Sequence, residues 1–336
     1  MNYRAVPGTD ISLSEIGLGT WTIGGPYWTD GQPTGWAGAI DEEDVIRGIR
    51  MAIDAGVNHI DTADAYGYGK SERLISQAIK GTLREKLVLA TKVGWIRTSA
   101  PSPFIAQNIR AQCEQSLRNL GTDYIDIYYF HHCDFGTNDM YLADAIATMY
   151  NLKAEGKIRC IGLSGYSEAD LLRVGTVLRP SVIQSWADIE HDEFIRSGCG
   201  LRCFMDDNNI RFIPMMPYAQ GRLLGKYSPE SPPHFDNGDN RQGNIAFTRE
   251  SLAELQPRLA ALKERFGNRI EDLAAVALQF LLANSVVASV IPGFRTAKQI
   301  EVNIQAAAKH LNDDDIDYIL KFFPRSAMSP HPWSSN

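Results

Sequence analysis

The sequence predicts an α/β protein that folds as a (β/α)8 barrel, the TIM-barrel architecture. Short apolar runs alternate with amphipathic helical stretches almost from end to end, and the alternation repeats about eight times. Eight consecutive βα units close into a barrel when their crossovers are right-handed. A doubly wound sheet shows the same alternation but is expected to carry G-x-G-x-x-G after an early strand. Here Gly17 and Gly19 are followed by Thr22 at the third glycine position, so the barrel is favoured.

The strand candidates are short, mostly apolar runs, as expected for parallel strands that are covered on both faces. They occupy residues 16–21, 57–61, 87–92, 124–131, 159–164, 181–184, 210–216 and 289–293. The crossing that follows 181–184 is irregular, whereas the other connections fit the simple alternation.

The helix candidates carry apolar residues three and four positions apart, the spacing of a helix that covers a sheet. They occupy residues 41–56, 71–81, 105–121, 142–156, 168–178 and 269–284. Several end in glycine, which suits a left-handed C-cap.

Two long segments, 22–40 and 228–247, do not fit regular elements. Each follows a strand, which in a barrel places it at the C-terminal, catalytic face. No linker is visible. We therefore expect one domain over residues 1–336, with 322–336 as a C-terminal tail.

The composition argues against several function classes. A net charge of −7 disfavours nucleic acid as a partner, because phosphate binding needs basic patches. The five cysteines are odd in number and contain no C-x-x-C pair, so reduced thiols in a cytoplasm are expected. Neither a signal peptide nor an apolar run approaching the roughly 18 residues of a membrane span is visible. The sequence thus predicts a cytoplasmic protein with no membrane partner.

Four polar residues mark a candidate active site. Asp61, Lys92 and His131 end three successive strand candidates, and Tyr66 follows Asp61 by five positions. Taken singly, each has an ordinary explanation: a helix cap, a surface ammonium, a structural imidazole and a packed aromatic. Together, at one rim of a barrel, they favour catalysis, because ionisable groups at buried strand ends need a partner or a task.

These residue types suit the reduction of a carbonyl. Hydride addition creates an alkoxide that needs a proton. A tyrosine has an ordinary pKa of about 10, which a neighbouring ammonium lowers by favouring the phenolate. On this interpretation Lys92 tunes Tyr66, Asp61 keeps Lys92 charged, and His131 orients the carbonyl oxygen or relays the proton.

The chain resembles the aldo-keto reductases, in the branch that includes the potassium-channel β subunits and many bacterial reductases. The motifs occur in the family's order over residues 3 to about 310. They are G-x-N-x-I-D-T-A-x-x-Y-G at 56–67, L-A-T-K at 89–92, D-Y-I-D-x-Y-x-x-H at 123–131, G-L-S at 162–164, Gln184, A-Q-G-x-L-L-G-K-Y at 219–227, and S-V-I-P-G at 289–293.

The resemblance implies a barrel whose N-terminal β-hairpin plugs the bottom, with NADP(H), or NAD as the alternative, across the C-terminal rim. It makes Tyr66 the general acid. The implied cofactor contacts are Gly19, Thr20, Trp21, Asp61, Ser164, Gly165, Gln184, Met215, Ala219, Gln220, Gly221, Lys226, Gly293, Arg295, Gln299 and Asn303. Ser164 and Gln184 match residues that hold the nicotinamide carboxamide. Arg295 is the candidate for the 2′-phosphate, the alternative being a surface arginine.

The expected substrate pocket is formed by Trp21, Tyr27, Trp28, Tyr66 and His131, with contributions from residues 186–200 and the tail near Trp333. Two positions depart from the family. Gly165 replaces the usual asparagine, and Met215 replaces the aromatic residue that commonly stacks on the nicotinamide. A metal site from His131, His132 and Asp134 is disfavoured, and no metal is expected.

The predicted function is NADP(H)-dependent interconversion of an aldehyde or ketone and its alcohol. A sugar-like carbonyl suits the aromatic and polar residues, although a lipophilic carbonyl suits the same aromatics. Two alternatives stay open: a nicotinamide-binding regulatory or partner-binding subunit with little turnover, and a lyase or isomerase that retains its nicotinamide. The natural substrate, the preferred direction and the oligomeric state are left open.

Overall fold

The computed structural model describes residues 1–29, 31–97 and 99–324. Seven parallel strands form one sheet. Their order in the sheet is the same as their order along the chain. The strands, in order, are β3 (Leu18–Gly19), β6 (His59–Asp61), β7 (Val88–Val93), β8 (Ile125–Phe130), β9 (Ile158–Ser164), β10 (Val182–Trp186) and β11 (Arg211–Met215).

The eighth predicted strand closes the sheet into a barrel. Parallel bridges join Val290 to Ile16 on one edge and Ile291 to Met215 on the other. The chain passes so close to β3 that a Cβ added to Gly19 would lie 2.6 Å from the carbonyl oxygen of Ile291. Gly19 is therefore required by this close approach. The predicted (β/α)8 barrel is confirmed.

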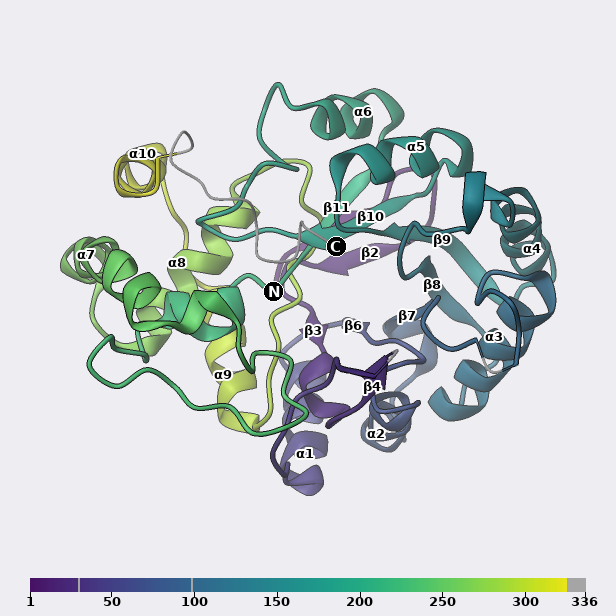
Figure 1. The fold of residues 1–336 in the computed structure, drawn as a ribbon, viewed down its shortest axis with the longest axis horizontal. Helices are drawn as coiled ribbons and strands as arrows, with labels where there is room; N and C mark the ends of the chain where they lie inside the picture. Colours follow the sequence, from purple (N-terminus) through teal and green to yellow (C-terminus); the bar gives the residue numbers. More distant parts are fainter. Residues whose placement is uncertain (30, 98, 325–336) are drawn as a thin grey trace.

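Six helices lie where the sequence predicted them: α1 (Glu42–Asp54), α2 (Lys70–Ala78), α3 (Ala106–Leu120), α4 (Leu142–Ala154), α5 (Glu168–Leu178) and α8 (Ile270–Leu282). Four more were not foreseen: α6 (Gly200–Asn208), α7 (Arg249–Phe266), α9 (Ala297–Ala306) and α10 (Asp313–Phe322). In Figure 1 the helices surround the strands, with α3 to α5 on the right of the view and α7, α8 and α10 on the left.

The N-terminal hairpin closes the bottom of the barrel, as the resemblance implied. Strands β1 (Tyr3–Ala5) and β2 (Ser12–Ser14) pair antiparallel. Leu13 is fully buried and belongs to one apolar cluster with Val88 and Ile127. Val88 is the first residue of β7, and Ile127 lies in the first half of β8. Because these positions lie toward the N-terminal ends of the strands, the opposite, C-terminal end is left for the site.

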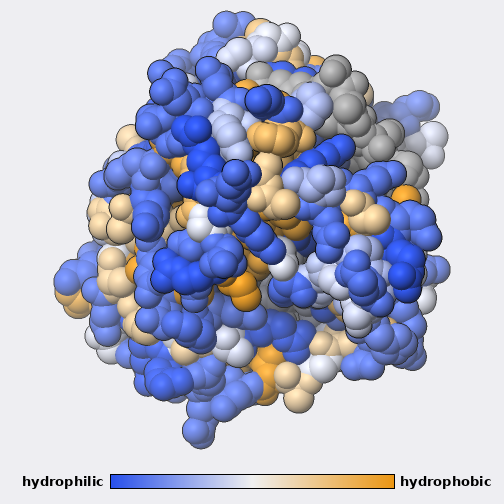
Figure 2. Space-filling view, turned by 90° about the vertical axis from the view of Figure 1, so that its left-hand side faces the viewer, coloured by the Kyte–Doolittle hydropathy of each residue, from blue (hydrophilic) through white to orange (hydrophobic). Residues whose placement is uncertain are grey.

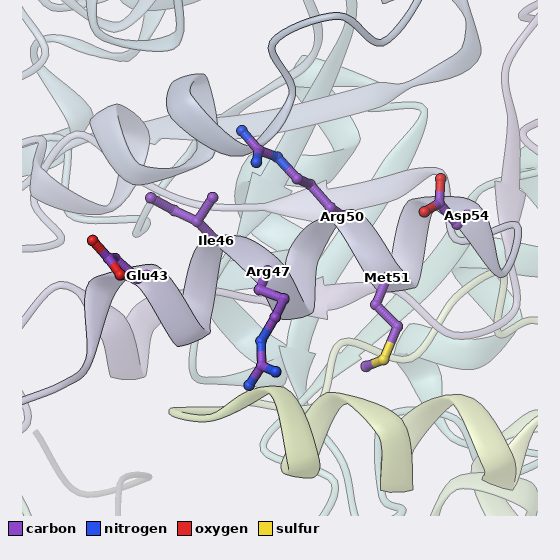
Figure 3. A pocket seen from close by; sticks show the side chains of 6 residues that line it. All are labelled: Glu43, Ile46, Arg47, Arg50, Met51 and Asp54. Atoms are coloured by element: carbon purple, nitrogen blue, oxygen red, sulfur yellow. The ribbon is translucent and has the colours of Figure 1, made fainter.

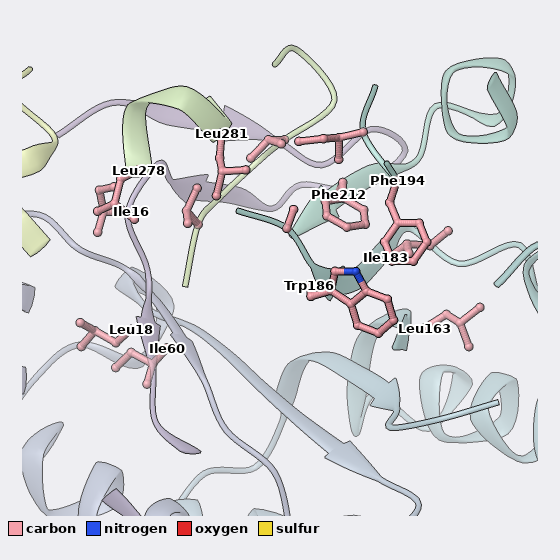
Figure 4. Close-up of a cluster of buried hydrophobic side chains, with 14 of the residues drawn as sticks. Ile16, Leu18, Ile60, Leu163, Ile183, Trp186, Phe194, Phe212, Leu278 and Leu281 are labelled. Carbon is pink, nitrogen blue, oxygen red and sulfur yellow. The ribbon is translucent and has the colours of Figure 1, made fainter. Parts of the chain in front are cut away.

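Successive residues of a strand serve two apolar layers. In β8, Ile127 and Tyr129 belong to the cluster inside the barrel, whereas Tyr128 and Phe130 belong to the layer between strands and helices. Figure 4 shows part of that outer layer, which combines strand residues such as Phe212 and Trp186 with Leu278 and Leu281 of α8. Alternation along each strand thus supplies both layers.

The segment 22–40, expected to be irregular, contains three short elements. A single 3-10 turn (η1) covers Trp21–Ile23, and β4 (Trp28–Thr29) pairs antiparallel with β5 (Gln32–Pro33). The segment 228–247 contains an isolated antiparallel bridge between Ser228 and Ser231 and, at its end, the 3-10 turn η5 (Ile245–Phe247).

The surface on the side of α7 to α10 is mostly hydrophilic, with small apolar spots scattered over it (Figure 2). Scattered apolar groups of this kind are normal for a folded chain in water. Within the described ranges, no helix has the length and hydropathy to cross a membrane. The five cysteines are all free thiols.

Candidate active site

Lys92 is the centre of a buried polar cluster. Its ammonium donates to Asp61 Oδ1 at 2.5 Å, to the carbonyl of Thr62 at 2.8 Å and to the hydroxyl of Tyr66 at 3.3 Å. Lys92 and Asp61 lie on the adjacent strands β7 and β6, and both are almost inaccessible to solvent. The three donors of the ammonium are thus all used, and the expected grouping of Asp61, Lys92 and Tyr66 is present in space.

A third strand supports the carboxylate. Gln184, on β10, donates its side-chain amide to Asp61 Oδ2 at 2.8 Å. Both oxygens of Asp61 therefore have partners, and the ion pair is satisfied in a site where an unpaired charge would be strongly destabilising. Sequence reasoning assigned Gln184 to the cofactor and did not foresee this contact.

A tight turn places Tyr66 above Lys92. The backbone N–H of Tyr66 donates to the carbonyl of Ala63 at 3.2 Å. Gly67 follows with a φ of 60°, and a Cβ added there would lie 2.1 Å from the carbonyl oxygen of Gly24. Only glycine fits this position. The turn holds the Tyr66 ring with its centroid 5.1 Å from the Lys92 ammonium.

His131 is the next residue after β8 and faces Tyr66. The two rings meet edge to face with centroids 5.7 Å apart. Burial, followed by the charge of Lys92, holds the pKa of His131 well below its ordinary value. The imidazole is therefore neutral near pH 7. In this form one ring nitrogen can donate a hydrogen bond to a ligand and the other can accept one. Its Nδ1 has no partner among the described residues.

The neighbouring imidazole of His132 belongs to a different environment. Its Nε2 lies 2.8 Å from the carbonyl of Gly94, and its ring packs against Trp95 and Phe104. Among the described residues, no three His, Cys, Asp or Glu side chains are grouped as metal ligands would be.

The protonation of Tyr66 corrects one step of the sequence argument. Lys92 was expected to lower the pKa of the phenol, but burial, followed by the charge of Asp61, raises it well above its ordinary value. Burial also lowers the pKa of Lys92, against the opposing effect of Asp61. Desolvation outweighs the ammonium here, because the phenolate loses more hydration than one nearby charge replaces. Tyr66 is therefore a neutral phenol, the form that a proton donor needs.

Aromatic side chains from Trp21 and from the segment 22–40 that follows it stand beside the cluster. The indole N–H of Trp21 donates to the hydroxyl of Tyr27 at 3.1 Å and to the carbonyl of Thr34 at 3.0 Å. Tyr27 is buried in one apolar cluster with Tyr66. Trp28 is 46% exposed and stands farther out. Of the expected pocket residues, Trp21 and Tyr27 thus lie closest to Tyr66 and His131.

Three further aromatics were not foreseen individually. Trp95 packs edge to face on His131, with centroids 6.1 Å apart. Tyr166 stacks on Trp186, with centroids 5.9 Å apart. Trp95 and Tyr166 each follow the end of a strand by two residues, which is a signal that could have found them. The expected contribution near Trp333 lies outside the described residues.

Local packing explains why a glycine stands at position 165. A Cβ at this position would lie 2.8 Å from Leu171 Cδ2 and 3.0 Å from the sulfur of Cys133. The carbonyl of Gly165 accepts from the hydroxyl of Ser185 at 2.7 Å. An asparagine would therefore require both neighbours to shift. Ser164, the preceding residue, ends β9 and is almost fully buried.

The loop after β11 is strained. Met216, Ala219 and Gln220 all have positive φ values, of 59°, 46° and 56°. Non-glycine residues rarely adopt this conformation, and clusters of them occur at ligand-binding sites. A Cβ on Gly221 would lie 2.7 Å from the Cε of Lys226, so these two residues pack directly together. Met215, just before the loop, packs against the cluster inside the barrel.

The segment after the eighth strand offers an unpaired donor. Asn303 accepts a hydrogen bond from the hydroxyl of Tyr218 at 2.7 Å, but its buried Nδ2 has no partner among the described residues. A buried donor without a partner costs about 1–3 kcal/mol, so a ligand acceptor would stabilise it. Gln299 accepts from the backbone N–H of Arg295 at 2.7 Å. Gly293 bridges to Gly19.

The hydroxyl of Thr20 makes hydrogen bonds within the protein. It donates to the carbonyl of Asp61 at 2.8 Å and accepts from Ser71 at 2.7 Å. The residue is fully buried. Its side chain therefore fixes the end of β3 to the turn that carries Tyr66, and is not available to a ligand.

Asp64 is a buried carboxyl that sequence reasoning passed over. Its side chain is almost fully buried, and neither oxygen has a hydrogen-bond partner among the described residues. Burial, followed by the charge of Glu72, raises the pKa of Asp64 well above its ordinary value. The group is therefore protonated in the folded chain at pH values where it ionises in the unfolded chain.

This predicts a pH-dependent effect of Asp64→Asn on stability. Below pH 4 both states of the wild type hold the proton and the carboxyl adds no pH dependence. As the pH rises above about 4, only the unfolded chain releases the proton, so the wild type loses stability at up to about 1.4 kcal/mol per pH unit. The amide of the variant cannot ionise, so the variant gains stability relative to the wild type as the pH rises. Urea denaturation of both proteins from pH 4 to 8 measures this, and parallel curves would contradict it.

A surface groove lies far from this cluster. It is lined by one face of α1, namely Glu43, Ile46, Arg47, Arg50, Met51 and Asp54 (Figure 3). The helix covers the outside of the barrel, whereas Asp61, Tyr66, Lys92 and His131 lie at the C-terminal ends of the strands. The groove is therefore separate from the candidate active site.

Comparison with known proteins identifies the family of the chain. Residues 15–322 match the model of the aldo/keto reductase family. The chain is 29% identical over 330 residues to the NADH-specific methylglyoxal reductase of Escherichia coli, covering 91% of this chain and 94% of that protein. It is 30% identical over 322 residues to an aldo-keto reductase of Bacillus subtilis, covering 94% and 91%.

Solved structures show the same fold. An aldo-keto reductase from Bacillus halodurans superposes with a TM-score of 0.75 at 25% identity, covering 99% of both chains. A glycerol dehydrogenase from Gluconobacter oxydans superposes with a TM-score of 0.79 at 24% identity, covering 98% of this chain and 97% of that one. The chain belongs to the aldo/keto reductase family.

Proposed function

We propose that the protein is a nicotinamide-dependent reductase that interconverts an aldehyde or ketone and its alcohol, with Tyr66 as the general acid and base. Hydride transfer at the carbonyl carbon is the chemistry that a bound nicotinamide supplies. The observation that carries the proposal is the Lys92 ammonium, which contacts both the Asp61 carboxylate and the Tyr66 hydroxyl inside a buried, aromatic-walled site.

Each of the four residues has a distinct task in this mechanism. Tyr66, as a neutral phenol, donates its proton to the oxygen that becomes the alcohol. Lys92, 3.3 Å from that hydroxyl, stabilises the phenolate left behind. Asp61 holds the ammonium in place. His131, neutral and edge-on to Tyr66, donates a hydrogen bond that orients the substrate oxygen.

The residues present fit a nicotinamide cofactor along the C-terminal rim. The unpaired Nδ2 of Asn303 and the strained loop at 216–221 support this. With its amide donated to Asp61, Gln184 offers its oxygen to the carboxamide beside Ser164. The remaining contacts proposed are those expected from the sequence, except Thr20, whose hydroxyl and backbone N–H both donate to the carbonyl of Asp61.

For the nucleotide itself we propose NADP(H), with Arg295 as the residue for the 2′-phosphate. NAD(H) is the alternative, since a relative is named as NADH-specific. The sequence favoured NADP(H) because a guanidinium suits a phosphate. Arg295 is engaged within the protein, where its guanidinium donates to the carbonyls of residues 37–39.

We further propose that the substrate is a small carbonyl compound held among Trp21, Tyr27, Trp95 and Tyr166. A sugar-like carbonyl would use the two phenol hydroxyls, and a lipophilic one would use the ring faces. We also propose one domain over the whole chain and a cytoplasmic location, which the five free cysteines support.

The test is a turnover assay with NADPH and with NADH across aldehydes, ketones and keto-sugars. Oxidation of the nucleotide that depends on the added carbonyl, with the alcohol recovered, supports the proposal. Binding of nucleotide without turnover on any of them would favour a regulatory subunit. Conversion of the substrate with no net oxidation of the nucleotide would favour a lyase or isomerase.

A further inference from the structure

Arg295 ties the end of the segment 22–40 to the barrel. Its guanidinium donates to the carbonyls of Ala37 at 2.7 Å, Gly38 at 2.7 Å and Ala39 at 3.2 Å. Three neighbouring backbone acceptors thus converge on one side chain. These contacts join residues that are more than 250 positions apart in the sequence.

The second long segment joins the same place. The Arg241 guanidinium lies 3.8 Å from the ring centroid of Trp36 and pairs with Asp239 at 2.8 Å. Asp239 also accepts from the backbone N–H of Ala37 at 3.3 Å. In Figure 1 the green segment that contains residues 238–241 runs up to the purple segment that contains β4 and β5. We call residues 36–39, 239–241 and Arg295 together the clasp.

The clasp adjoins residues proposed to hold the cofactor. Gln220, in the strained loop, donates to the side chain of Asn240 at 3.2 Å. Trp36 packs edge to face on Trp21, with centroids 5.7 Å apart. The clasp therefore borders the rim where the nucleotide is proposed to lie, from β3 round to the loop after β11.

Arg295 also stands where barrels commonly bind phosphate, between the last strand and the start of a following helix. That helix, α9, already has partners at its N-terminus. The backbone N–H of Ala297 donates to the Asp44 carboxylate at 2.8 Å, and the N–H of Gln299 donates to Thr296 Oγ1 at 3.3 Å. An incoming phosphate therefore meets the guanidinium at this place. Both N–H groups of Nη2 are used by the carbonyls of Gly38 and Ala39, so a phosphate that binds the guanidinium through two N–H groups must displace at least one of these carbonyls.

We propose that Arg295 is shared between the clasp and the 2′-phosphate of NADPH, so that NADPH loosens the clasp and NADH leaves it closed. The proposal rests on the proposed function. Hydrogen bonds between a guanidinium and a dianionic phosphate carry charge on both partners and can be bidentate, whereas the bonds to the carbonyls carry charge on the donor alone. The exchange therefore favours the phosphate, at the expense of the contacts that hold residues 37–39. Nothing in NADH competes for the guanidinium.

Hydrogen–deuterium exchange tests the coupling without relying on activity. Backbone exchange over residues 35–40 and 238–242 is measured for the free protein and at saturation with NADH or NADPH. We expect NADPH to speed exchange in these residues relative to NADH. In Arg295→Met we expect fast exchange with either nucleotide, and about 10- to 100-fold weaker NADPH binding with NADH binding unchanged.

A matched control is Arg211→Met. Arg211 also donates to backbone carbonyls, of Ala5 at 3.3 Å and Ser285 at 2.7 Å, but it begins β11 at the opposite end of the barrel. It should leave both nucleotide affinities unchanged. Equal exchange with the two nucleotides in the wild type would overturn the proposal while leaving the proposed function intact. Undiminished NADPH binding in Arg295→Met would overturn the proposal and the assignment of Arg295 to the 2′-phosphate, while leaving nicotinamide-dependent reduction intact. A protein that binds neither nucleotide would overturn both.

Discussion

Tyr66→Phe is expected to lower kcat by about 10²- to 10⁴-fold, the range for a lost general acid. The substitution keeps the ring and removes only the hydroxyl that lies 3.3 Å from the Lys92 ammonium. Nucleotide affinity should stay the same, because the ring still fills its place against His131. The measurement is kcat on the best substrate of the panel, together with nucleotide binding followed by fluorescence.

Tyr128→Phe is the matched control. Tyr128 is also fully buried, and its hydroxyl has no hydrogen-bond partner among the described residues. It points into the layer between β8 and the helices rather than into the barrel. Loss of this hydroxyl should leave kcat unchanged. If Tyr66→Phe retained wild-type turnover, another group would have to be the proton donor.

Lys92→Met is expected to affect both stability and catalysis. The side chain is fully buried, and its removal would leave Asp61 with Gln184 as its remaining side-chain partner. Removing one member of a buried ion pair costs about 3–5 kcal/mol, because the other charge stays buried without compensation. Turnover should fall to near background, since no cation would then stabilise the phenolate of Tyr66.

The double variant Asp61→Asn/Lys92→Met separates the two effects. It leaves no uncompensated charge, so we expect it to be more stable than Lys92→Met in urea denaturation while remaining inactive. A surface control is Lys157→Met, whose ammonium pairs with Glu114 and Glu155 but is 34% exposed. Exposed ion pairs contribute about 0–1 kcal/mol. A Lys92→Met protein as stable as the surface variant would contradict the buried ion pair.

Local patterns were enough to predict the barrel and the four central residues. A parallel strand that is covered on both faces consists mostly of apolar residues. Each of the eight apolar runs could therefore be found without knowledge of its neighbours. Asp61, Lys92 and His131 stood out because each is ionisable at the end of such a run. In a barrel, consecutive strand ends lie side by side, and sequence order alone therefore implied their proximity.

The missed helices α6, α7, α9 and α10 show where local patterns are weaker. Helix α7, for example, contains Pro257 and has a high content of charged residues, which obscure the periodicity of its buried leucines. Its buried face is recognisable only once α8 and α10 are seen beside it. Amphipathic packing against other helices stabilises such segments more than their own propensity does.

The sequence by itself determined the strand order and the residues that meet at the catalytic rim, because these follow from short-range periodicity and from one rule of barrel geometry. The hairpin was expected from the family resemblance alone. Only the tertiary structure decided how those residues behave. Burial reversed the expected direction of the Tyr66 pKa, β10 brought Gln184 to Asp61, and Arg295 met the carbonyls of residues 37–39. Desolvation and contacts between distant segments depend on what surrounds a group in space, and the local sequence does not encode that surrounding.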